Sequence, residues 1–167
     1  MKPHIPRAAP VLLAHGSAAL LLGALAFQHW GGLAPCVLCL WQRGPHVVAI
    51  AAGLVGMFLI RQGRVASAGW ATLAAALALA VTSGIGAYHA GVELHWWEGT
   101  AACGSTGPTA TTAASLRNQL LAAPVVRCDE IPWSLFGISM AGWNFLISGA
   151  LALFGLCSGT ALLKAGR

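Results

Sequence analysis

The chain has 167 residues, of which 57% are apolar and only 8% are charged, and its formal net charge is +5. Soluble domains carry about 25% charged residues, so this chain has too little polar surface for a water-soluble globule. We therefore expect an integral membrane protein with one compact domain over residues 1–167. The sequence carries no phosphate-loop, nucleic-acid-binding or hydrolase motif, so these function classes are not supported.

Four apolar segments, at about residues 10–30, 40–60, 67–90 and 139–163, predict membrane-spanning helices. A hydrocarbon core about 30 Å thick needs about 20 helical residues, and each segment is long enough. The segments lack the strict alternation of barrel strands, so an all-α bundle of four transmembrane helices is expected. The first segment also resembles a cleaved signal peptide. However, its apolar run exceeds the usual length of about 7–15 residues, which favours an uncleaved helix.

The basic residues predict the orientation of these helices. Most of them flank the N-terminus, the link between the second and third segments, and the C-terminus: Lys2, Arg7, Arg61, Arg64, Lys164 and Arg167. Arg43, Arg117 and Arg127 fall on the opposite side. Because basic residues concentrate on the cytoplasmic side, both termini are expected in the cytoplasm. The loops at about 31–39 and 91–138 then face outward.

Five cysteines are distributed unevenly over this topology. Cys36 and Cys39 lie in the first outward loop, Cys103 and Cys128 lie in the second, and Cys157 lies inside the last helix. The outward side of a cell membrane is where disulfides persist. The Cys-x-x-Cys spacing favours a reactive disulfide over a structural one. Cys157 is expected to be a buried small apolar residue.

The predicted second helix places Cys39 at or near its N-terminal end. Unpaired backbone N–H groups and the helix dipole favour an anion there. Arg43 follows one turn later, on the same helix face if the helix already runs through this turn. Pro45 is tolerated in a first helical turn and so indicates a nearby helix start. The pattern predicts a thiolate at Cys39 that is stabilised by Arg43.

Cysteines can also bind zinc, attach a haem or form a purely structural disulfide. Zinc sites of this kind usually have a second closely spaced pair, which the sequence lacks, so no metal is expected. A c-type haem site needs a histidine directly after the second cysteine, where the chain has Leu40. A purely structural disulfide between Cys103 and Cys128 stays open on spacing alone.

Three stretches together resemble the bacterial disulfide-bond formation protein B (DsbB) family of quinone-linked membrane oxidases. They are "PCVLCLWQR" after the first helix, "AYHAGVELHWWEGTAAC" entering the long loop, and "CDEIPWSLFGISMAGWNFL" leading into the last helix. The resemblance covers nearly the whole chain. It implies a bacterial inner-membrane enzyme that reoxidises a periplasmic thioredoxin-fold oxidase of the DsbA type and passes the electrons to ubiquinone or menaquinone.

The resemblance also implies roles for individual residues. Cys36 and Cys39 match the quinone-proximal pair, with Cys39 as the thiolate that contacts the quinone ring. Arg43 matches the arginine that stabilises both the quinone and that thiolate. Cys103 and Cys128 match the loop pair that meets the soluble partner, and Cys103 is the expected site of the mixed disulfide.

Some positions near this site depart from the family pattern or align loosely. Gln42 stands where well-known members carry an acid. His89 lies roughly where the family has a histidine close to the quinone, and His95 competes for that position. Glu93 is expected to be a polar group at a helix end.

The remaining features concern the long loop and the rival functions. Residues 111–124 predict a short amphipathic helix on the membrane surface. The tryptophans within residues 95–99 and 131–143, Trp133 and Trp143 among them, predict interfacial anchors. A vitamin K epoxide reductase-like enzyme also packs four helices around a quinone, but its redox pair lies at a late helix. A membrane scaffold with structural disulfides is the rival from a different class.

Overall fold

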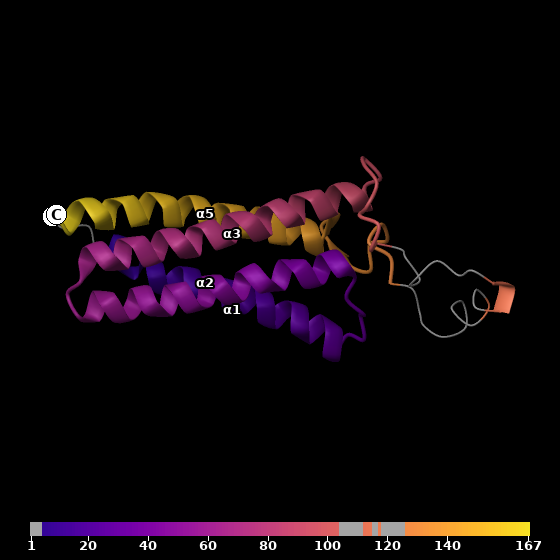
Figure 1. The fold of residues 1–167 in the computed structure, drawn as a ribbon, viewed down its shortest axis with the longest axis horizontal. Helices are drawn as coiled ribbons and strands as arrows, with labels where there is room; N and C mark the ends of the chain where they lie inside the picture. Colours follow the sequence, from indigo (N-terminus) through magenta and orange to yellow (C-terminus); the bar gives the residue numbers. More distant parts are fainter. Residues whose placement is uncertain (1–4, 104–111, 115–116, 118–125) are drawn as a thin grey trace.

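The computed structural model describes residues 5–103, 112–114, 117 and 126–167, and its long helices run side by side along one axis (Figure 1). The elements in chain order are α1 (Ile5–His29), α2 (Val37–Arg61), α3 (Val65–Glu93), β1 (Ser134–Leu135), β2 (Ile138–Ser139) and α5 (Met140–Ala165). Within the described residues, α1, α2, α3 and α5 are each long and apolar enough to cross a membrane. The prediction of a helical membrane bundle is confirmed.

Small residues bring the helices close together. A Cβ atom built on Gly69 of α3 would lie 3.0 Å from the backbone oxygen of Gly159 in α5. A Cβ on Gly155 would lie 2.8 Å from the Cβ of Ala76. Lipid tails are as apolar as side chains, so helices associate in a membrane through close packing of this kind. The α3–α5 contact therefore depends on small residues at the helix interface.

The end of the bundle opposite the C-terminus holds the short loop between α1 and α2 and the antiparallel β1–β2 hairpin (Figure 1). Phe136 and Gly137 connect the two strands, and both have positive φ angles, 53° and 77°. A two-residue turn with positive φ at both positions matches the twist of a hairpin. The sequence pattern predicted no strands here, because two residues per strand are too few to show alternation.

Cys157 departs from its predicted environment, because it is exposed on α5. The buried face of α5 carries small residues such as Ala152, Gly155 and Gly159, and Cys157 lies off that face. A thiol is apolar enough to face lipid without a hydrogen-bond partner, so hydrophobicity alone did not predict burial. The amphipathic helix expected over residues 111–124 lies mostly outside the described residues.

The packing predicts a difference between two glycine substitutions on α3. Gly69→Leu should lower the free energy of unfolding by about 1–3 kcal/mol, because its side chain meets Leu163 and the α5 backbone. Gly84→Leu should change it little, because a Cβ there meets nothing within 4 Å. Thermal unfolding in detergent compares the two variants. Equal midpoints would contradict this account of the α3–α5 contact.

Candidate thiol redox site

Cys36 occupies the N-terminus of α2. The helix begins at Val37, with Cys36 as the capping residue, and the Cys36 Sγ accepts a hydrogen bond from the Cys39 backbone N–H at 3.2 Å. The sequence pattern predicted a helix start near residue 40 and the anionic sulfur at Cys39. The structure starts the helix earlier, so the unpaired N–H groups of its first turn favour an anion at Cys36 instead.

Further donors converge on the Cys36 sulfur. Cys36 and Cys39 are free thiols with their sulfurs 2.9 Å apart, and the His89 Nε2 lies 3.5 Å from the Cys36 Sγ. The hydrogen bond from the Cys39 thiol lowers the pKa of Cys36, burial opposes this effect, and His89 adds to the lowering. The thiol pair is therefore arranged to carry its negative charge on Cys36.

Cys103 and Cys128 form a disulfide across the long loop, with their Cα atoms 5.2 Å apart. Cys128 is fully buried and packs in one cluster with Cys36 and Val92, and Cys103 and Cys39 lie against that cluster. The four cysteines singled out in the sequence are thus brought together at one end of the bundle. This arrangement leaves a short path for thiol–disulfide exchange between the two pairs.

His89 and Glu93 lie on the last turns of α3, beside the thiols. Both side chains are buried, and the His89 Nε2 lies 3.8 Å from the Glu93 Oε1. The other ring nitrogen, Nδ1, is 3.0 Å from the Gln42 Nε2. His95 instead lines a separate surface hollow next to Cys103. Of the two histidines weighed in the sequence, His89 is the one beside the thiol pair.

Arg43 points from α2 toward α1. Its Nη1 donates a hydrogen bond to the Gln28 Oε1 at 2.7 Å. Its Nε is buried, and among the described side chains it lacks a hydrogen-bond partner. A buried donor without a partner costs free energy, so this nitrogen is available to an acceptor that enters the site.

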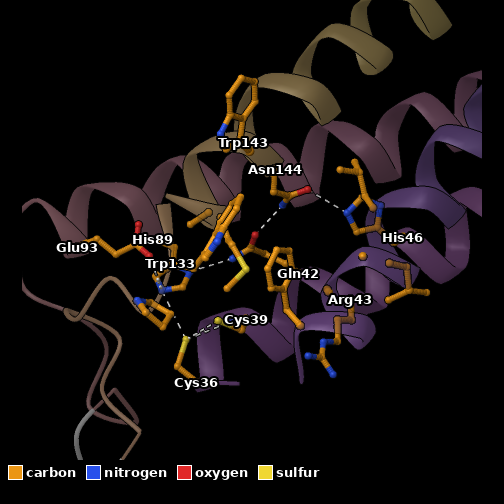
Figure 2. A pocket seen from close by; sticks show the side chains of 18 of the residues that line it. Cys36, Cys39, Gln42, Arg43, His46, His89, Glu93, Trp133, Trp143 and Asn144 are labelled. Carbon is orange, nitrogen blue, oxygen red and sulfur yellow. Dashed lines mark hydrogen bonds and ion pairs between the residues drawn. The ribbon is translucent and has the colours of Figure 1, made fainter. Parts of the chain in front are cut away.

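A cavity of about 410 Å³ opens beside the thiols (Figure 2). Its apolar wall comes from α1, from α5 and from the segment that precedes α5, and it is also lined by Cys36, Cys39, Arg43 and His89. The ring centroids of Phe27 and Trp133 are 4.7 Å apart on its wall. Mostly apolar and aromatic walls with a few polar groups are typical of small-molecule sites.

Several residues of this site were missed or undervalued in the sequence. Trp133 and Trp143 were interpreted only as interfacial anchors, yet both line the cavity. His46 and Asn144 are buried and line it as well. Polar residues inside apolar helices are the signal that could have found this last pair, because such residues are costly in a membrane and often functional.

A thiol pair at a helix start, a disulfide packed against it and an apolar cavity inside a helical bundle define a membrane thiol–disulfide oxidase. Residues 6–158 match the family model described as disulfide bond formation protein DsbB. The chain belongs to this family, as the resemblance predicted.

Two relatives are both described as disulfide bond formation protein B. The protein from Polaromonas sp. (strain JS666 / ATCC BAA-500) is 31% identical over 166 residues, covering 96% of this chain and 94% of the relative. The protein from Verminephrobacter eiseniae (strain EF01-2) is 33% identical over 153 residues, covering 89% and 82%. No solved structure gave a significant match.

The lowered pKa of Cys36 predicts an unusual titration of the reduced protein. An ordinary thiol has a pKa of about 8.5, so it is mostly protonated at neutral pH. Cys36 should remain a thiolate at neutral pH and gain its proton only in acid, because its pKa is lowered. Thiolate absorbance, followed with pH in a Cys103→Ser/Cys128→Ser background, measures this transition. If Cys36→Ser removes only a transition near the ordinary value, the assignment is wrong.

Proposed function

We propose that this oxidase accepts electrons from a periplasmic thioredoxin-fold dithiol oxidase of the DsbA type and passes them to membrane quinone. The observation that carries the proposal is the position of Cys36. We call Cys36 and Cys39 the inner pair and the disulfide-bonded Cys103 and Cys128 the outer pair. Cys36 packs against Cys128 of the outer disulfide on one side and lines the apolar cavity on the other. A sulfur in this position can exchange with the outer pair while its partner, Cys39, faces a lipid-soluble acceptor.

The thiol steps follow the general chemistry of exchange, in which a thiolate attacks one sulfur of a disulfide and releases the other as a thiolate. A thiolate of the partner attacks Cys103, forms a mixed disulfide and releases Cys128. The Cys128 thiolate attacks Cys36 of an oxidised inner pair and releases Cys39. The second partner thiol resolves the mixed disulfide and releases Cys103, which attacks Cys128 and frees Cys36.

The net result of these steps is an oxidised partner, an intact outer disulfide and an inner pair that has been reduced by two electrons to two thiols. The inner pair must then lose two electrons to become a disulfide again.

The cavity residues fit a quinone. A bound quinone accepts two electrons and two protons, and the redox chemistry then belongs to that group. The apolar wall and the Phe27–Trp133 aromatic pair suit a flat, lipid-soluble ring. The unpartnered Arg43 Nε supplies a donor for a carbonyl oxygen. We assign Cys39, Arg43 and His89 to the quinone site on these grounds.

The location follows from the charges at the two ends of the bundle. Arg61 and Arg64 flank the link between α2 and α3, and this link lies at the same end as the C-terminus (Figure 1). The positive-inside rule assigns that end to the cytoplasm. The thiols at the opposite end then face the periplasm from a bacterial inner membrane.

Quinone reduction tests the proposal. Detergent-purified protein is supplied with a reduced DsbA-type protein and with ubiquinone or menaquinone, and quinol formation is followed. Cys39→Ser should abolish turnover. Arg43→Ala should raise the apparent KM for quinone roughly tenfold, as expected for a lost hydrogen bond from a charged donor.

Arg61→Ala is the matched control, because it removes the same side chain at the other end of α2. It should leave the KM unchanged. If the wild-type protein transfers electrons to neither quinone, the proposed function is wrong. The disulfide would then be structural, as in a membrane scaffold.

A further inference from the structure

A line of buried hydrogen bonds runs from the interior of the bundle to the thiol pair (Figure 2). The His46 Nε2 lies 3.0 Å from the Asn144 Oδ1, and the Asn144 Nδ2 lies 2.6 Å from the Gln42 Oε1. The Gln42 Nε2 lies 3.0 Å from the His89 Nδ1, and the His89 Nε2 reaches the Cys36 Sγ. Gln42, His46, His89 and Asn144 are each at least nine-tenths buried.

Two backbone carbonyl groups fix the direction of the amide groups in this line. The Gln42 Nε2 also donates to the Leu38 oxygen at 3.3 Å, and the Asn144 Nδ2 donates to the Thr82 oxygen at 3.3 Å. A carbonyl oxygen only accepts hydrogen bonds, so each of these amide ends must be the NH2 group. Gln42 therefore presents a donor to His89, and Asn144 presents a donor to Gln42.

The neighbours of His89 then determine which ring nitrogen carries its proton. The Nδ1 receives the Gln42 NH2 group, so it must hold a lone pair. The Nε2 faces two acceptors, the Cys36 sulfur and the Glu93 carboxyl group. This pattern fits a neutral imidazole with its proton on Nε2.

His46 follows the same rule at the other end. Its Nε2 faces the Asn144 Oδ1, which only accepts, so that nitrogen carries the proton. Its Nδ1 therefore holds the lone pair and lies 2.7 Å from the Ser17 hydroxyl group, which also donates to the His46 backbone oxygen at 3.2 Å. From the His46 Nε2 onward, each donor in this series of hydrogen bonds thus points toward Cys36.

We propose that Gln42 and Asn144 are positioning residues that hold His89 in the tautomer protonated at Nε2, so that His89 donates a hydrogen bond to the Cys36 sulfur. Neither residue touches that sulfur. They act by fixing which nitrogen of His89 is the donor, as the second partner of a histidine generally does. This assignment rests on the proposed function only for the use of Cys36 in exchange.

The tautomer is read directly by nitrogen NMR of the full chain with ¹⁵N-labelled histidine. The protein is purified in detergent and reduced, without quinone or partner. We expect a pyrrole-type signal from the His89 Nε2 and a pyridine-type signal from the Nδ1, both identified by their loss in His89→Gln. Gln42→Glu replaces the donor by an acceptor and should transfer the proton to Nδ1.

Gln62→Glu is the control, because it makes the same change at the exposed C-terminal cap of α2. It should leave the His89 signals as in the wild type. A wild-type proton on Nδ1, or a Gln42→Glu variant with unchanged signals, would overturn the proposal. Since the signals need neither quinone nor partner, this result is independent of whether the protein reduces quinone.

A second variant tests the more distant residue. Asn144→Leu removes one of the two groups that orient Gln42, while the Leu38 oxygen remains and His89 is not touched. A second tautomer of His89 should then become visible beside the first. The Cys36 thiolate should then react with a small disulfide such as oxidised glutathione at a rate changed by about tenfold, as expected for an altered hydrogen bond to a charged group. A single unchanged tautomer in a variant that unfolds at the wild-type temperature would contradict the role of Asn144.

Discussion

The site depends on one interaction, the capping of α2 by the Cys36 sulfur. The first turn of a helix has backbone N–H groups without partners, and burial makes them costly to leave unpaired. The sulfur of Cys36 accepts one of them, from Cys39. This contact fixes the Cys-x-x-Cys pair at a helix terminus, where a negative charge is favoured. The α3 residue His89 can then approach the same sulfur from the side.

Because this cap lies at the end of an apolar bundle, Cys36 borders two different environments, the outer disulfide and the cavity. On one side, Cys36 packs with Cys128 of the outer disulfide, which belongs to the long loop. On the other side, the cavity has apolar and aromatic walls suited to a molecule that arrives through lipid. Under the proposed function, a soluble partner and a lipid-soluble acceptor therefore never need to meet, because the two cysteine pairs connect them.

The sequence predicted the parts of this design that depend on local pattern. The length of apolar segments predicted the bundle, and the cysteine positions singled out the four cysteines that the structure brings together at one end of it. Pro45 favours a first helical turn and so predicts a start of α2 that is too late, because it lies inside the helix, which begins at Val37. The series of buried hydrogen bonds from His46 to Cys36 could not be predicted. Gln42 and Asn144, which form one of its contacts, are 102 positions apart in the sequence and meet only through helix packing.

The most direct test of the central claim, that oxidation reaches the outer pair only through the inner pair, is a single turnover without a partner protein. Fully reduced protein receives one equivalent of quinone, and the disulfides are then mapped by mass spectrometry. The account predicts a Cys103–Cys128 disulfide in the wild type and none in Cys39→Ser, which retains both outer cysteines. Formation of that disulfide at the same rate in both proteins would contradict the account.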